Sequence, residues 1–256
     1  MAGAKVRPAA GGGRWVDVDP ERLPAWLNRF AVNHGGYRVA GVDEALRIEA
    51  ADGTSLALWP PPGAALRPDI EEFLDEAMRP RRLGLLLARQ ASVAVGIAEG
   101  PRLVVSKVDT YYVQSRTAAG GWSQQRFARR RANQARAAAE SAADQAVRIL
   151  LTAVDPPVAA DGTAGAQAPD DSRRAADRQA AVDYEIGASA RLAAVVTGGD
   201  RRAVAAILAD PRLSPVRPLV ADRFLAVGEP RRRTLEEAVQ LARQVRVLVR
   251  DPDSGG

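Results

Sequence analysis

The residues best suited to chemistry lie together near the middle of the chain, between residues 117 and 131. The loop part of this segment contains two adjacent glycines, an indole, a hydroxyl and two side-chain amides, namely Gly120, Gly121, Trp122, Ser123, Gln124 and Gln125. Adjacent glycines let a backbone come close to a ligand, and an indole can stack on a base. Four arginines follow that can anchor the loop to phosphates, namely Arg126, Arg129, Arg130 and Arg131. The same spacing also fits a loop without function that leads into a solvated, arginine-rich helix.

The charge of the chain is concentrated just after this loop. Residues 126–136 carry five arginines and no acid, whereas the whole chain has 36 basic and 31 acidic residues and a net charge of +5. The five positive charges of this stretch therefore equal the net charge of the whole chain, and the other residues balance to zero. A local basic patch on an otherwise neutral body is the pattern expected for contact with phosphate.

The composition excludes several kinds of catalytic site. The chain has no cysteine, so disulfides, thiol nucleophiles and thiolate metal sites are excluded. His34 is the only histidine, which leaves almost no basis for a zinc site or a Ser-His-Asp triad. We expect His34 to be an ordinary residue at the end of a helix, and we expect neither a cofactor nor a metal.

No membrane segment is apparent in the sequence. No run of apolar residues approaches the 18 or so that span a bilayer, and residues 1–14 lack the apolar core of a signal peptide. We expect residues 1–14 to be flexible, and we expect a cytoplasmic protein without a membrane partner.

Residues 15–80 predict a small N-terminal α/β lobe. Apolar residues recur at helical spacing from Leu23 to Phe30. Apolar and polar residues then alternate on either side of Asp52-Gly53, which predicts a hairpin. Asp69 is placed to cap a short helix.

From residue 82 the pattern changes to that of a second domain. Three short apolar runs predict antiparallel strands, and a helix is expected from about residue 125 to 152. The helix carries a seam of small residues, namely Ala128, Ala132, Ala135, Ala139, Ala142 and Ala146. Residues 155–182 are rich in proline, glycine, alanine and aspartate, so we expect a flexible insertion.

The rest of the chain alternates strands and helices. A strand at 191–197, a helix, a strand at 222–228 and a helix opened by a capping box at Thr234 and Glu237 follow in turn. The order β-β-β-α-β-α-β-α predicts an α/β (α+β) protein with a ribonuclease-H-like mixed sheet. We assign residues 82–249 to this domain, with the last apolar run closing it as an extension or a strand.

A metal-dependent nuclease of this fold is not expected. Such enzymes need carboxylates on the first and fourth strands to hold Mg²⁺. The first strand, 83–90, and the fourth, 191–197, contain no acid, and Asp200 lies beyond the latter. Glu140 and Asp144 on the long helix therefore lack partners for a metal site.

The segment GGWSQQRFARRR resembles the catalytic loop of the archaeal and eukaryotic class I peptide release factors. Their signature runs Gly-Gly-Gln-Ser, two variable residues, then Arg-Phe-x-Arg. The positions in register are Gly120, Gly121, Ser123, Arg126, Phe127, Arg129 and Arg131. The central domain of those factors also has the expected order of strands and helices, with the loop before the long helix. The resemblance covers roughly residues 82–249, apart from the insertion.

One position departs from the release factor signature. Trp122 stands where the family has its catalytic glutamine, and Gln124 lies two positions later with Gln125 beside it. A displaced glutamine is typical of the release-factor-like peptidyl-tRNA hydrolases of ribosome quality control and of their bacterial relatives. The chain resembles that bacterial branch most. It contains nothing similar to a codon-reading domain, so we do not expect stop-codon recognition.

The resemblance implies hydrolysis of the ester between a nascent peptide and tRNA, inside the large ribosomal subunit. Gln124, or else Gln125, would orient water, and Gly120 and Gly121 would let the loop tip enter a narrow site. Trp122, Ser123 and the four arginines would contact RNA. The implied partners are peptidyl-tRNA and ribosomal RNA, and the protein is expected to be monomeric.

Two other functions fit the same residues. A ribosome- or RNA-binding module could keep the basic helix and lack hydrolysis. A protein-docking domain could use the arginine-rich helix to bind an acidic partner.

Overall fold

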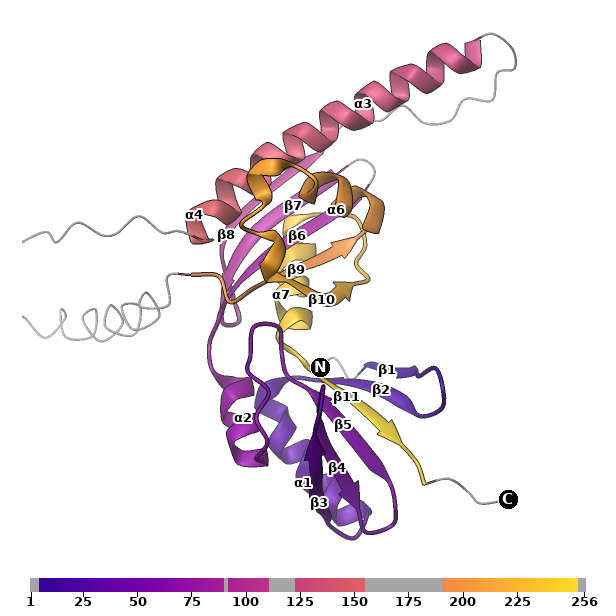
Figure 1. The fold of residues 1–256 in the computed structure, drawn as a ribbon, viewed down its shortest axis with the longest axis vertical. Helices are drawn as coiled ribbons and strands as arrows, with labels where there is room; N and C mark the ends of the chain where they lie inside the picture. Colours follow the sequence, from indigo (N-terminus) through magenta and orange to yellow (C-terminus); the bar gives the residue numbers. More distant parts are fainter. Residues whose placement is uncertain (1–4, 90–91, 111–122, 155–190, 253–256) are drawn as a thin grey trace, which may run out of the picture. The chain divides into compact units, whose positions relative to one another are not determined.

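A computed structural model describes residues 5–89, 92–110, 123–154 and 191–252. The chain forms two compact units, one made of Met1–Arg79 with Glu237–Gly256 and the other of Pro80–Glu236. Figure 1 shows a sheet and helices in each unit. The expected α/β (α+β) class is therefore confirmed.

The second unit is built on a five-stranded mixed sheet. Its strands are β6 (Arg82–Arg89), β7 (Ser92–Glu99), β8 (Arg102–Thr110), β9 (Ala194–Gly199) and β10 (Val220–Leu225). They lie in the order β10-β9-β6-β7-β8, in which β6, β7 and β8 pair antiparallel while β9 and β10 continue parallel to β6. This is the strand order of a ribonuclease-H-like fold, as the sequence predicts.

A long helical segment packs on this sheet. It consists of α3 (Ser123–Ala146), a π-helical turn (Val147–Leu151) and α4 (Thr152–Val154). Ala142, Ala146 and Leu150 are buried in one core with the β7 side chains Val93 and Val95. Two members of the predicted alanine seam thus pack against the sheet. Small residues at this contact let helix and strands come close together.

The other helices of the second unit follow its parallel strands. These are α6 (Arg201–Leu208) after β9 and α7 (Arg232–Arg243) after β10, with 3-10 turns at Pro211–Leu213 and Arg217–Leu219. Helix α7 begins in the second unit, and its residues from Glu237 onward belong to the first. The capping box predicted at Thr234 is wrong, because α7 begins two residues earlier. The Thr234 hydroxyl instead donates to the carbonyl oxygen of Glu229 at 2.8 Å.

The first unit contains a six-stranded antiparallel sheet. Its strands are β1 (Lys5–Pro8), β2 (Arg14–Val18), β3 (Tyr37–Val42), β4 (Leu46–Ala50), β5 (Ser55–Trp59) and β11 (Val245–Arg250), in the order β1-β2-β11-β5-β4-β3. A 3-10 turn (Pro20–Arg22), α1 (Leu23–Asn33) and α2 (Ile70–Met78) complete the unit. The predicted hairpin at Asp52-Gly53 joins β4 to β5, and the Asp69 carboxylate caps α2 by accepting from the N–H groups of Glu71 and Glu72.

Strands β1 and β11 correct the predicted domain boundaries. The sequence predicts that residues 1–14 are flexible, but β1 lies among them and pairs with β2. We assigned residues 82–249 to one domain, but β11 lies between β2 and β5 in the sheet of the first unit. Val245, Val247 and Val249 join the core beneath that sheet. Sequence alternation predicts such a strand but not which sheet it enters. The expected insertion, 155–182, lies outside the described residues.

Candidate nucleic-acid interface

The predicted site residues divide at the start of α3. Gly120, Gly121 and Trp122 lie outside the described residues. Ser123, Gln124, Gln125 and the arginines Arg126, Arg129, Arg130 and Arg131 belong to the first turns of α3. The helix therefore begins earlier than the expected residue 125, and both glutamines are helical. Backbone N–H groups in the first turn of a helix have no carbonyl acceptor earlier in that helix, so this end of α3 offers donors as well as side chains.

The other end of α3 is held firmly in the second unit. Ala142, Ala143 and Ala146 are buried, whereas Arg136 and Glu140 are exposed. Figure 1 shows α3 crossing the sheet and continuing beyond it. The packed half thus anchors the helix, and its N-terminal half carries the predicted site residues away from the core.

An ion-pair cluster adds to this anchor. The Arg212 guanidinium lies 2.7 Å from the Asp144 carboxylate on α3 and 2.8 Å from the Asp210 carboxylate. Hydrogen bonds from the Arg212 side chain and from its backbone N–H lower the pKa of Asp210 from 3.8 to about 2. Asp144, which the sequence left without a partner, therefore binds the turn that follows α6.

Strand β8, which precedes the predicted loop in the sequence, ends at the edge of the sheet where the parallel strands end. β8 runs parallel to β6, β9 and β10, because it pairs antiparallel with β7 and β7 pairs antiparallel with β6. The carboxyl ends of these four strands therefore share one edge, which we call the carboxyl edge. The loop begins where β8 ends, at Thr110, and α6 and α7 also begin on this side.

Exposed arginines gather at the carboxyl edge. They are Arg89 at the end of β6, Arg201 and Arg202 at the start of α6, and Arg231 and Arg232 at the start of α7. The Arg201 guanidinium lies 4.1 Å from the centre of the Phe224 ring, and Arg232 pairs with Glu236 at 3.2 Å. The sequence analysis missed this group because its members lie far apart along the chain. Arginines that recur at the ends of the parallel strands are the sequence pattern that could have predicted it.

Few acids offset these arginines. The Asp200 carboxylate accepts from the backbone N–H groups of Arg202 and Ala203, at 2.7 and 3.3 Å, and so caps α6. The Glu229 carboxylate accepts from the buried Ser92 hydroxyl. Both acids stay charged, but with Glu236 they are three carboxylates against five arginines, so the arginines give this part of the carboxyl edge its basic character. Such a surface attracts phosphate.

The paired glycines at the end of β9 serve packing. Gly199 has a φ of +96°, and a Cβ there would lie 2.3 Å from the carbonyl oxygen of Ala88 on β6. A Cβ on Gly198 would lie 2.8 Å from the carbonyl oxygen of Leu225 on β10. The glycines are needed because neighbouring strands approach closely where the chain turns into α6. Their role is therefore to form a strand-to-helix turn, and we do not assign them to phosphate binding.

The remaining candidate residues have local roles. His34 caps the end of α1, as expected, and its Nδ1 lies 2.8 Å from the Asp52 carboxylate. Over the four described ranges, no three histidine, cysteine, aspartate or glutamate residues come together in a way that could hold a metal ion. None of the helices in those ranges is both long and apolar enough to cross a membrane.

Comparison with known proteins gives one family match. A family model described as Actinobacteria/Chloroflexi VLRF1 release factor matches residues 81–248. No curated protein matches the chain. Among solved structures, the crystal structure of archaeal translation termination factor aRF1 matches with 12% sequence identity and a TM-score of 0.40. That match covers 89% of this chain and 63% of the archaeal one, so the chain spans less than two thirds of that factor's length.

Proposed function

The chain belongs to the Actinobacteria/Chloroflexi VLRF1 release factor family, and on that premise we propose that it hydrolyses peptidyl-tRNA on ribosomes or large subunits that have stalled. Family membership supports a role in translation at the ribosome. The observation that carries the finer proposal is the Gly-Gly-x-x-Gln segment at residues 120–124, directly before and within the first turn of a long basic helix.

The chemistry asked of this segment is modest. An aminoacyl ester is already activated, so hydrolysis needs a well-placed water and stabilisation of the developing oxyanion more than a strong base. In our proposal the Gln124 amide orients the water. Backbone N–H groups at the start of α3 support the leaving 3′-oxygen. The substrate's ribose hydroxyl and ribosomal RNA supply the proton transfers.

The arginines serve binding in this proposal. Arg126, Arg129, Arg130 and Arg131 contact RNA phosphates along α3, and Trp122 and Ser123 contact RNA at the loop. The arginines of the carboxyl edge add a second basic surface, on the edge of the sheet at which β8 ends. Phosphate contacts position a protein on RNA without reading its sequence. This arrangement therefore suits a factor that acts on any stalled peptidyl-tRNA, whatever the codon.

A non-catalytic RNA-binding module is the second candidate, and Trp122 favours it. The indole replaces the glutamine that acts in the class I release factors. Such a module would keep the arginines and bind ribosomes without releasing peptide.

The test is peptide release from stalled complexes. Large subunits carrying radiolabelled peptidyl-tRNA are incubated with the wild-type chain, without any other release factor. We expect free peptide to appear in proportion to the protein added, and to depend on Gln124. Salt-sensitive binding to the subunits without release would contradict the enzymatic proposal and support the binding module.

A further inference from the structure

The six-stranded sheet of the first unit has one covered face and one open face. Val16, Ile48 and Val247 face α1 and α2 and lie in the core between sheet and helices. Because side chains alternate along a strand, the residues between them point to the opposite side. The strand register aligns these residues into rows across the sheet, which we call the open face.

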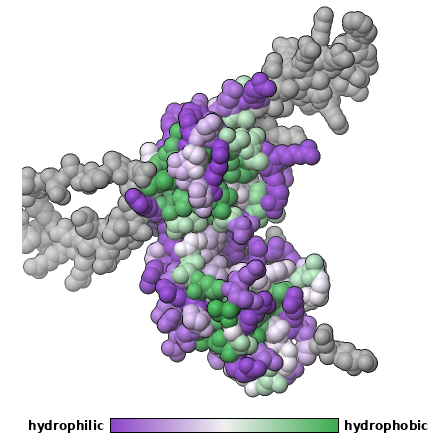
Figure 2. All heavy atoms as spheres, viewed as in Figure 1, coloured by the Kyte–Doolittle hydropathy of each residue, from purple (hydrophilic) through white to green (hydrophobic). Residues whose placement is uncertain are grey.

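Each row of the open face mixes planar or apolar groups with arginines. One row joins Trp15, Leu248, Ala57 and Arg47, and the next joins Arg246 to Trp59. A third row joins Arg250, Ser55, Glu49 and Arg38. Figure 2 shows hydrophobic residues bordered by hydrophilic ones over the strands of this unit.

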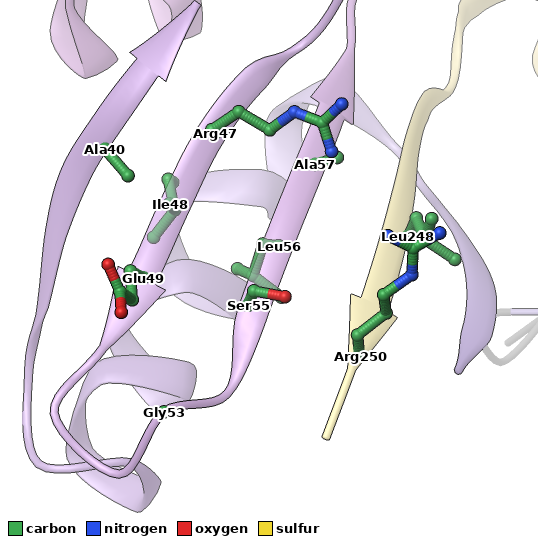
Figure 3. A pocket seen from close by; sticks show the side chains of 10 residues that line it. All are labelled: Ala40, Arg47, Ile48, Glu49, Gly53, Ser55, Leu56, Ala57, Leu248 and Arg250. Carbon is green, nitrogen blue, oxygen red and sulfur yellow. The ribbon is translucent and has the colours of Figure 1, made fainter. Parts of the chain in front are cut away.

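A shallow hollow of about 160 Å³ lies on this face. Figure 3 shows its apolar floor at Ala57 and Leu248, with Arg47 and Arg250 beside it. The hollow is smaller than the pocket of a typical small-molecule ligand, and its lining combines apolar side chains with the polar Glu49 and Ser55 as well as the two arginines. It therefore offers an apolar floor against which a flat group can lie, with arginines beside it that can contact an anion.

Two half-buried tryptophans lie next to the hollow. The rings of Trp15 and Trp59 are 5.1 Å apart, and the Arg246 guanidinium lies 5.7 Å from the centre of the Trp15 ring. Indole rings and guanidinium planes are the groups on which unpaired bases stack.

The charge of the open face is basic. It carries Arg7, Arg38, Arg47, Arg246 and Arg250 against Asp17, Glu49 and the neighbouring Asp43. Arg7 and Arg246 both pair with Asp17, Arg38 pairs with Glu49 and Arg47 with Asp43, so these four arginines share three carboxylates. Arg250 is exposed and pairs with no carboxylate among the residues that the structure describes. A polyanion therefore complements this surface.

We propose that the open face binds single-stranded RNA, independently of any hydrolysis by the second unit. Unpaired bases lie against the tryptophans and the apolar floor of the hollow, and phosphates lie on Arg47, Arg246 and Arg250. An acidic peptide would satisfy the arginines but would leave the indoles and the hollow without a flat partner. RNA satisfies both.

Binding to RNA tests this with the full chain. Fluorescence anisotropy of a labelled single-stranded oligoribonucleotide is measured over a salt series. The background carries glutamine in place of Arg126, Arg129, Arg130 and Arg131, so that α3 contributes little. We expect Trp59→Ala to weaken binding at least about fivefold. Arg250→Glu should weaken it too and lower the salt slope by about 1.

The matched control is Arg29→Glu, an equal charge reversal at an exposed position on α1, beneath the covered face. It should change neither affinity nor slope. If Trp59→Ala fails to fold, the exposed Arg250→Glu carries the test alone. Binding that Arg250→Glu and Arg29→Glu affect equally, or that an acidic peptide displaces better than RNA, overturns the proposal. Peptide release is measured separately on Trp59→Ala and Arg250→Glu in a chain with all α3 arginines present, so failure of the proposed hydrolysis remains distinguishable.

Discussion

Gln124 and Gln125 occupy successive positions of α3, and successive positions of a helix are rotated by about 100°. The two side chains therefore leave the helix in different directions, and only one of them can contact the ester of the substrate in the proposed way. Gln124 is our choice because it lies closer to the Gly-Gly pair. This assignment stays a prediction, which comparison of Gln124→Ala with Gln125→Ala tests.

Gly199 offers a test of a single backbone position. We expect Gly199→Ala to lower the free energy of unfolding by more than about 1 kcal/mol, because its φ is positive and the new Cβ would meet the Ala88 carbonyl. Gly228→Ala is the control, since a Cβ there meets nothing within 4 Å; a change within about 0.5 kcal/mol is expected. Urea denaturation measures both. Equal losses in the two variants would contradict the packing explanation.

At the scale of elements, α3 combines a packed half with a half that extends beyond the sheet. Ala142 and Ala146 fix the packed half in the core, and Arg212 ties Asp144 to the neighbouring turn. A rigid helix anchored at one end can hold residues at its other end in a defined place. This is how the second unit would present a loop to a distant substrate.

The ion-pair cluster beside α3 predicts a pH dependence. The folded-state pKa of Asp210 is about 2, below its usual 3.8, so the charged carboxylate stabilises the fold above about pH 4. Asp210→Asn should therefore be less stable than wild type at neutral pH. The difference should shrink as the pH falls from about 4 toward 2. Urea denaturation over this range measures it, and a difference that does not vary with pH would exclude the Arg212 explanation.

Local signals in the sequence predicted many elements well. Asp52-Gly53 marks a hairpin and Asp69 caps a helix because each acts through bonds to its immediate neighbours. Strand β3 gave no clear signal, since most of its residues are exposed and Gly41 interrupts its alternation. The arginines of the carboxyl edge and the sheet to which β11 belongs depend on contacts between distant segments, which no local pattern contains.

At the scale of the whole molecule, the first unit is closed by the last strand of the chain. β11 pairs with both β2 and β5, so it is an interior strand of the sheet. The two units are thus linked twice along the chain, before β6 and within α7. Folding of the first unit must wait until the second has been synthesised.

Removing β11 should therefore unfold the first unit. A chain that ends at Gln244 loses the three valines that face α1 and α2, and it leaves β2 and β5 without a partner on one side. We expect the backbone amides of β4 and β5 to lose their protection from hydrogen exchange, while those of β6 and β7 remain protected. A chain that lacks only residues 253–256 is the control. Retained protection in β5 after loss of β11 would show that the sheet does not need it.

The central claim is that a glutamine at the start of α3 positions water on the ester of peptidyl-tRNA. Single-turnover peptide release, with protein in large excess over stalled large subunits, tests it most directly because the rate then reports chemistry and not binding. We predict that Gln124→Ala lowers this rate about 100-fold or more, with unchanged affinity for the subunits, and that Gln125→Ala lowers it far less. Equal release rates for wild type and both variants would contradict the claim.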